Sequence, residues 1–451
     1  MEMETLEFDL DALIRAQDFD PVRERFELLH PADIAAMINE LDAREGWAAL
    51  ELLPLARKAD TFGYLDHDFQ VELATVAPRA KLAAIVVQMN ADERADLYNE
   101  LSEDQREALM PALVQAERED IRKLAAYEEG TAGAIMTSDY ATLAPDLTAT
   151  QALTRLRREA PDKETIYRTY VVDEDRKLIG SVRLQDLITA PARAKVGGIM
   201  ETNTLAVSVD DDQEEVARKI GRYDMLALPV IDAEGRIVGI VTHDDALDVI
   251  EEETTDDFHR VGTVTNLATT VGEATIGMLY RARIMWLVLL VFGNIFSGAG
   301  ISYFEDTLAA NLTLMFFLPM LIASGGNAGA QSATLMVRAL ATGDVRFSDW
   351  GYLILRETVV ALALGLTMAA AVSLLGFWRG GTDLALTVSL SMICIVMIGS
   401  LIGLSLPFAL QRFNLDPATA SAPLVTSIAD VVGVVIYFSI ATTFLPMPGS
   451  G

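Results

Sequence analysis

A single carboxylate stands inside the last long apolar stretch of the chain, which runs from Leu424 to Leu445. This residue, Asp430, is energetically unfavourable in a bilayer, because placing an Asp at the centre of a membrane helix costs about 2.5–3.5 kcal/mol. Chains that keep such a residue most often use it to contact an ion or a proton that crosses the membrane. The alternative is a buried Asp that only bonds a neighbouring helix.

An earlier apolar stretch contains a polar run, Pro319-Met-Leu-Ile-Ala-Ser-Gly-Gly-Asn-Ala-Gly-Ala-Gln331. Its glycines each weaken a helix by about 1 kcal/mol relative to Ala; they are Gly325, Gly326 and Gly329. Its polar side chains cannot be satisfied by lipid; they are Ser324, Asn327 and Gln331. The run predicts a helix inside the protein, where it lies against other helices or lines a water-filled path. The alternative is a face of small residues that only packs against another helix.

Five apolar stretches are long enough to cross roughly 30 Å of hydrocarbon, which takes about 20 helical residues. They lie at 284–302, 312–336, 352–377, 384–410 and 424–445. With the N-terminus inside, six arginines fall on the cytoplasmic side and only Arg379 falls outside, as expected from the excess of basic residues in cytoplasmic loops. Five spans then place the C-terminus outside.

The net charge of −30 is unevenly spread, because residues 281–451 hold only seven of the 35 basic and eight of the 65 acidic side chains. The acidic part, 1–280, makes nucleic acid an unsuitable partner, since phosphate binding needs basic surface. It favours cations as partners instead.

Cys394 is the only cysteine, so no intrachain disulfide forms. The acidic start lacks the basic region of a signal peptide, which predicts a cytoplasmic N-terminal half.

Residues 131–250 contain an internal repeat, whose copies open at Gly133-Ala-Ile-Met and Gly197-Gly-Ile-Met. Each copy closes with two apolar strands around a turn, followed by a helix. This resembles a tandem CBS (Bateman) module, a pair of small α/β units. Such modules often bind adenine nucleotides, so ATP is an implied ligand, and Asp186 and Asp245 match the position that often holds a ribose. An empty, purely structural pair is the alternative.

Residues 1–130 show helical spacing of apolar side chains. A weak repeat relates 30–41 to 90–101, with a poorer copy at 64–73. Repeats about 30 residues long predict a small stack of helix pairs.

An acidic run follows the second CBS copy at 244–257, where eight of fourteen residues are acidic and none is basic. Like charges at i,i+4 each destabilise a helix by about 0.2–0.5 kcal/mol, so bound cations would stabilise it. Carboxylates suit Mg²⁺ or Ca²⁺. Further clusters lie at 92–96 and 210–215. A solvated face is the alternative. No zinc-binding spacing, Walker A motif or catalytic triad signature is present, so we expect no enzyme.

The order of these parts, together with the second-span motif and Asp430, resembles the MgtE family of bacterial magnesium channels over nearly the whole chain. The implied fold is multidomain, with an all-α helical-repeat N domain, an α/β tandem CBS pair and a membrane domain of five transmembrane helices. The implied boundaries are 1–130 for the N domain, 131–190 and 191–250 for the CBS units, 251–280 for an acidic connecting (plug) helix and 281–451 for the pore domain.

The resemblance also implies a homodimer in the bacterial inner membrane, with a pore lined by the second and fifth spans. The pore residues that match the family are Asp430, Thr426, Asn327, Gly325 and Gly326. The matching regulatory Mg²⁺ ligands are Asp92, Asp96, Glu214, Asp224, Asp245, Asp248, Glu253, Asp256, Asp257 and Asp416. One departure is Ala422, where relatives are expected to carry Asn or Gly.

The predicted function is therefore magnesium uptake down the electrochemical gradient, closed by Mg²⁺ binding to the acidic cytosolic domains. The partners are a second copy of the chain, the lipid bilayer and Mg²⁺. Two alternatives stay open: an exchanger that couples a divalent cation to Na⁺ or H⁺, and a membrane-anchored Mg²⁺ sensor without transport.

Overall fold

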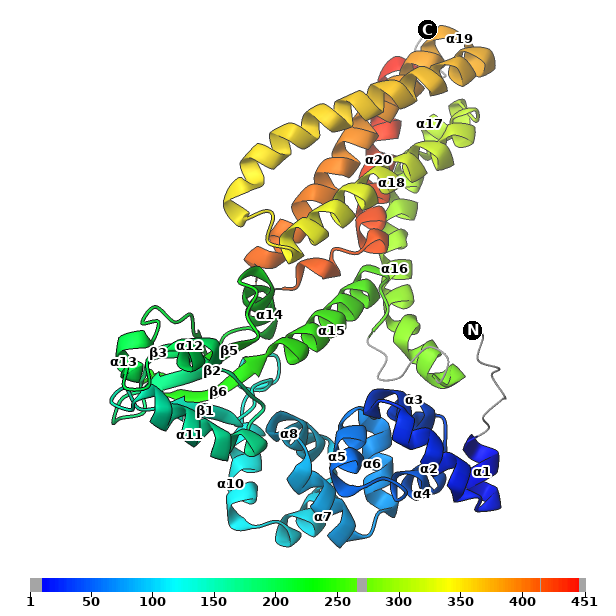
Figure 1. The fold of residues 1–451 in the computed structure, drawn as a ribbon. Coiled ribbons are helices and arrows are strands. Elements are labelled where there is room, and N and C mark those ends of the chain that lie inside the picture. Colours follow the sequence, from blue (N-terminus) through cyan, green and yellow to red (C-terminus); the bar gives the residue numbers. More distant parts are fainter. Residues whose placement is uncertain (1–9, 266–273, 414, 446–451) are drawn as a thin grey trace, which may run out of the picture. The chain divides into compact units, whose positions relative to one another are not determined.

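The computed structural model describes residues 10–265, 274–413 and 415–445 (Figure 1). The chain divides into two compact units, Met1–Glu251 and Glu252–Gly451. Residues 266–273, which belong to the predicted connecting segment, lie outside the described part.

The first unit begins with short helices. They are α1 (Leu10–Ala16), α2 (Phe19–Leu28), α3 (Pro31–Asn39), α4 (Ala43–Leu50), α5 (Leu55–Gly63), α6 (His67–Val76), α7 (Arg79–Gln88), α8 (Ala91–Glu100), α9 (Glu103–Leu109) and α10 (Gln115–Leu124). Helix α3 packs on α5, α4 on α6, α5 on α7 and α6 on α8, as in a stack of helix pairs. The predicted repeat copies become α3, α6 and α8. Their inward faces build one apolar core that includes Phe26, Ile34 and Phe62.

The CBS pair forms two three-stranded sheets with the same topology, which confirms the internal repeat. The first sheet contains β1 (Tyr140–Leu143), β2 (Thr165–Val172) and β3 (Leu178–Arg183), and the second contains β4 (Val207–Ser208), β5 (Ala227–Ile231) and β6 (Ile237–Thr242). In each sheet the first two strands are parallel and the last two antiparallel. The helices are α11 (Ala149–Glu159), α12 (Leu184–Thr189), α13 (Val196–Ile199) and α14 (Gln213–Arg222).

Two buried tyrosines of the first sheet join the two CBS units. The Tyr140 hydroxyl donates to the carbonyl of Ile237 at 2.9 Å, and the Tyr170 hydroxyl donates to the carbonyl of Ala227 at 3.4 Å. Apolar contacts surround both rings. The relative placement of the two sheets therefore depends on side chains buried between them.

A single helix, α15 (His243–Val261), follows directly from β6 and contains the acidic run. It starts earlier and ends earlier than the predicted 251–280. The N–H of Val264 donates to the carbonyl of His259, and that of Thr263 to Arg260, with φ +55° at Thr263. This is the Schellman pattern, in which a left-handed residue terminates a helix.

The second unit consists of long helices: α16 (Ile276–Tyr303), the short α17 (Glu305–Ala310), α18 (Leu314–Ala341), α19 (Trp350–Arg412) and α20 (Ala422–Phe444). Helix α19 reverses at Gly381, whose φ of 77° favours glycine, and Figure 1 shows its yellow half returning as an orange half. Five long helical segments therefore correspond to the five predicted stretches. The multidomain fold class is confirmed.

Among the described residues, three stretches are long and apolar enough to cross a membrane: Ile276–Tyr303, Phe347–Arg412 and Ala422–Phe444. Helix α18 is as long as α16, with 28 residues each, but it carries the polar run. It packs against both α19 and α20. A helix enclosed by other helices needs less apolar surface than one that faces lipid.

The glycines of α18 determine how closely these helices approach. A methyl group at Gly325 would lie 2.5 Å from Cγ2 of Ile395, and one at Gly326 would lie 2.8 Å from Cγ2 of Thr426. At Gly329 it would lie 2.7 Å from the carbonyl oxygen of Gly399. These glycines therefore act as packing positions that bring α18 against α19 and α20.

Candidate metal sites

Asp430 lies in the middle of α20, and its Oδ1 atom is buried without a hydrogen-bond partner in the described part of the chain. Thr426 stands four residues earlier, on the same helix face, and packs on Gly326 of α18. An unpartnered buried oxygen costs free energy unless something pairs with it. The site therefore suits a cation.

Three further pore predictions lie on α18. Gly325 and Gly326 are buried in the contacts with α19 and α20, whereas Asn327 is exposed on the single chain. The glycines thus serve packing, and the Asn327 side chain points to a surface that the described chain does not cover.

A cluster of carboxylates joins three segments of the first unit. Asp92 and Glu93 come from α8, Glu164 precedes β2, and Asp245 belongs to the first turn of α15. Oδ1 of Asp92 is buried without a partner among the described residues. Burial raises the pKa of Asp92 well above its usual range, and Asp245, Glu93 and Glu164 raise it further. The cluster is therefore short of positive charge.

The neighbours of Asp92 are affected in the same way. Burial raises the pKa of Glu93 to about 7, and Asp245 adds to this. Burial also raises the pKa of Glu164 to about 7, with Asp245 and Asp244 adding to it. For Asp245 burial raises the pKa to about 6, although the Thr242 hydroxyl donates to it at 2.5 Å.

The described residues contain no group of three or more His, Cys, Asp or Glu side chains arranged to hold a metal ion. Mg²⁺ usually keeps several waters and is held by only one or two carboxylates. The unpartnered Oδ1 of Asp92, whose charge interacts with that of Asp245, meets the requirement of one or two carboxylates. The residues present therefore fit a hydrated Mg²⁺ better than a fully protein-bound ion.

Other predicted ligands are not brought together. Glu214 lies in the first turn of α14 and Asp224 lies two residues after its end, so the rise of a helix separates them by roughly 15 Å. Glu214 lies 3.5 Å from Arg218, and Asp224, with φ 49°, lines a pocket instead. Asp96 is exposed on α8 and adds to the charge around Glu93.

The remaining predicted acids lie on α15 or beside it. Asp248, Glu253, Asp256 and Asp257 belong to α15. Burial raises the pKa of Asp248 and of Asp257. Asp416 accepts the N–H of Ala418 at 2.7 Å and forms an ion pair with Arg260.

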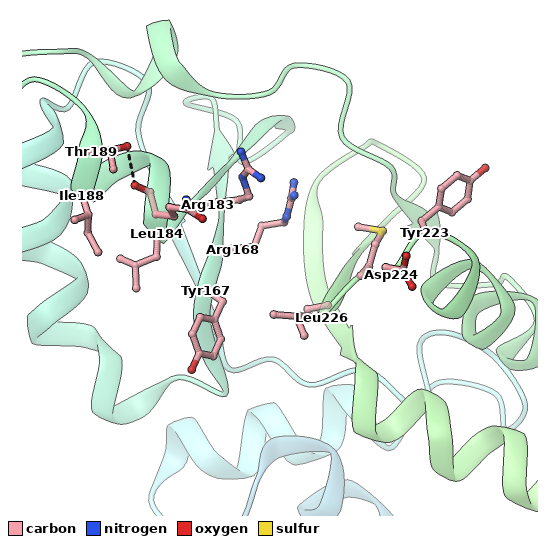
Figure 2. A pocket seen from close by; sticks show the side chains of 12 residues that line it. Tyr167, Arg168, Arg183, Leu184, Ile188, Thr189, Tyr223, Asp224 and Leu226 are labelled. Atoms are coloured by element: carbon pink, nitrogen blue, oxygen red, sulfur yellow. Dashed lines mark hydrogen bonds between the residues drawn. The ribbon is translucent and has the colours of Figure 1, made fainter.

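A pocket of about 580 Å³ lies between the two CBS units. Figure 2 shows Arg168 and Arg183 on one side, with Tyr223 and Asp224 on the other. Arg168 lies 3.0 Å from Glu201, and Arg183 donates to both oxygens of Asp186, at 2.8 and 3.1 Å.

The two predicted ribose-binding positions therefore differ. Asp186 lies beside the pocket through its Arg183 partner, whereas Asp245 belongs to the acidic cluster. The same position in the two repeats thus has different surroundings.

The sequence patterns missed several of these residues. Glu93 lies within the predicted 92–96 cluster, so its neighbours could have indicated it. Glu164 and Arg260 have no local signal, because their partners come from distant segments. The pocket arginines, Arg168 and Arg183, are equally unmarked in the sequence.

Three family models match the chain. An MgtE intracellular N domain matches residues 29–130, CBS domains match 132–193 and 196–252, and a divalent cation transporter model named MgtE matches 318–440. The matched segments follow the predicted order of parts.

Curated relatives match nearly the whole chain. A magnesium transporter MgtE from Thermus thermophilus is 39% identical over 445 residues, covering 98% of this chain and 99% of the relative. One from Bacillus subtilis is 31% identical over 434 residues, covering 96% of each chain.

Solved structures resemble about half of the chain. The cytosolic domain of the Mg²⁺ channel MgtE in complex with ATP has a TM-score of 0.50 and 40% identity, covering 52% of this chain and 97% of that one. The soluble part of a magnesium transporter has a TM-score of 0.50 and 32% identity, covering 54% of this chain and 95% of that one. The family resemblance is thus confirmed, and the chain belongs to the MgtE family of magnesium transporters.

Proposed function

We propose that this chain forms a Mg²⁺-selective channel that admits magnesium down its electrochemical gradient and closes when internal Mg²⁺ is high. The observation that carries the proposal is Asp430, a buried carboxylate with an unpartnered oxygen on a membrane helix. In support, Thr426, four residues earlier on the same helix, packs on Gly326 of the polar helix α18.

The pore is proposed to lie between two copies of the chain, lined by α18 and α20. The exposure of Asn327 supports this, because a polar side chain on a membrane helix needs a protein or water neighbour. Two Asp430 carboxylates would hold Mg²⁺ through its water shell. The membrane potential supplies about 2.3 kcal/mol per charge per 100 mV, and twice that for a divalent ion. The cytosolic half lies inside and the C-terminus outside.

Closure is proposed to depend on the acidic cluster. Asp92, Glu93, Glu164 and Asp245 come from three segments that repel one another when charged. Ions that neutralise them would draw the helical domain and the CBS pair together, which couples internal Mg²⁺ to the pore. The remaining proposed ligands are Asp96, Asp248, Glu253, Asp256 and Asp257.

The CBS pocket is proposed to bind ATP. Arg168 and Arg183 can pair with phosphates, and the pocket of about 580 Å³ has room for a nucleotide. The cytosolic domain of a relative, which is 40% identical to this chain, was solved in complex with ATP. This supports the proposal that the pocket binds ATP.

The test is Mg²⁺ flux into proteoliposomes under an imposed potential, with low internal Mg²⁺. Wild-type flux should be lost in Asp430→Asn and kept in Asp383→Asn, a matched control at an exposed position of the same unit. Equal flux in wild type and Asp430→Asn would refute the pore assignment. Flux that follows a Na⁺ or H⁺ gradient and ignores voltage would favour an exchanger.

A further inference from the structure

Arg260 lies one residue before the end of α15 and forms an ion pair with Oδ2 of Asp416. Both residues belong to the second unit. Asp416 begins the turn Pro417–Thr419, which leads directly into α20 at Ala422. Arg260 therefore connects the end of the acidic helix to the segment that carries Asp430.

Both oxygens of Asp416 are already used. Oδ1 accepts the N–H of Ala418 at 2.7 Å, which caps the turn, and Oδ2 accepts from Arg260. Each oxygen keeps a second lone pair, but a metal ion on Oδ2 would lie beside the Arg260 guanidinium, and the two positive charges would repel each other. Asp416 is therefore a poor Mg²⁺ ligand while Arg260 stays paired with it.

Apolar and backbone contacts hold the same end of α15. The partly buried Val261 packs against a buried cluster formed by Val337 of α18, Ala418 of the turn and Ala420 just after it. Beyond the helix, Thr265 donates to the carbonyl of Ala282 through its N–H at 3.0 Å and its hydroxyl at 3.2 Å. The Arg260 ion pair is thus one part of an interface that ties α15 to α16, α18 and the turn before α20.

The surroundings of Arg260 are otherwise acidic. Its Nη2 lies 3.7 Å from Oδ2 of Asp256, and its charge also acts on Asp257. One guanidinium therefore serves several carboxylates, which is the arrangement expected of a bridging cation.

We infer that Arg260 is a gating residue, a cation built into the chain that takes the place of Mg²⁺ at Asp416 and holds α15 on the turn before α20. This inference rests on the proposed Mg²⁺-closed channel. Part of the closed state is then independent of Mg²⁺, and the Mg²⁺ response belongs to the other carboxylates.

The test measures the internal Mg²⁺ concentration that halves flux in proteoliposomes. Arg260→Gln and Asp416→Asn, which keeps the capping oxygen, should each raise it roughly two- to fivefold, the range for a partly exposed ion pair. The double variant should match the single ones, and Arg260→Lys should stay within about twofold of wild type, because it keeps the positive charge. Arg338→Gln, a neutralisation at the exposed end of α18, is the matched control.

Two results would overturn the inference. Additive effects in the double variant would show that Arg260 and Asp416 act separately. A lower half-inhibiting concentration in Arg260→Gln would show that Arg260 merely blocks a metal ligand. If wild-type flux is not inhibited by Mg²⁺ at all, the proposed function fails instead.

A second measurement does not depend on transport. In Mg²⁺-free detergent solution, amide hydrogen exchange of 258–265 and 416–421 should be roughly two- to fivefold faster in full-length Arg260→Gln than in Arg338→Gln, because the contact loosens. Unchanged exchange would overturn the inference whatever the flux shows, and normal exchange elsewhere would show that the variant is folded.

Discussion

The acidic cluster around Glu93 makes the stability of the first unit depend on pH when Mg²⁺ is absent. Burial raises the pKa of Glu93 from 4.5 to about 7, so between these values the folded state binds more protons than the unfolded state. Its contribution to stability is fully present below pH 4.5 and is lost as the pH rises through 7. The total loss in the free energy of unfolding amounts to about 3 kcal/mol.

The linkage between proton binding and folding shows how this loss of stability is distributed over pH. About 2 kcal/mol is already lost at pH 6, and a further 1.4 kcal/mol or so is lost between pH 6 and 8.5. Since 1 kcal/mol shifts Tm by about 2–4 °C in a domain of this size, that step lowers Tm by roughly 3–6 °C. Glu164 acts in the same direction.

The perturbation is Glu93→Gln, which cannot ionise, and the assay is Tm of the first unit in EDTA from pH 6 to 8.5. The variant should lose the fall in Tm that Glu93 causes. Glu100→Gln, at an exposed position of the same helix, should keep it. Saturating Mg²⁺ should flatten the wild-type profile. The reasoning is refuted if Glu93→Gln and wild type show the same pH slope in EDTA.

Three further predictions concern the pore, the sensor and the pocket. Gly326→Ala places a methyl group 2.8 Å from a side chain of α20; it should cost about 1–3 kcal/mol and reduce Mg²⁺ flux, whereas Gly277→Ala, with open space around it, should leave both unchanged. Asp92→Asn should raise the internal Mg²⁺ concentration that halves flux, and an unchanged value would remove Asp92 from the sensor. Arg168→Ala should weaken ATP binding to the full-length protein by tenfold or more in equilibrium dialysis, because a charge-assisted bond to phosphate is lost. Arg193→Ala is the control, and equal affinities would contradict the pocket assignment.

The parts of the chain and their order could be predicted from the amino-acid sequence. The five apolar stretches, the CBS repeat and the helical first domain can be recognised from composition and periodicity, because both are properties of residues that are close together in the sequence. Asp430 was identifiable for the same reason, because a lone carboxylate in an apolar run is visible without knowledge of the fold.

Which charged side chains lie close together could be seen only in the folded chain. Glu164 joins Asp92 and Asp245 across three distant segments, and Arg260 reaches Asp416 through the path of the chain after α15. Asp186 and Asp245, matched by the repeat, lie in different surroundings. Coulomb interactions depend on separation in space and on burial, and neither can be read from the spacing of residues along the chain.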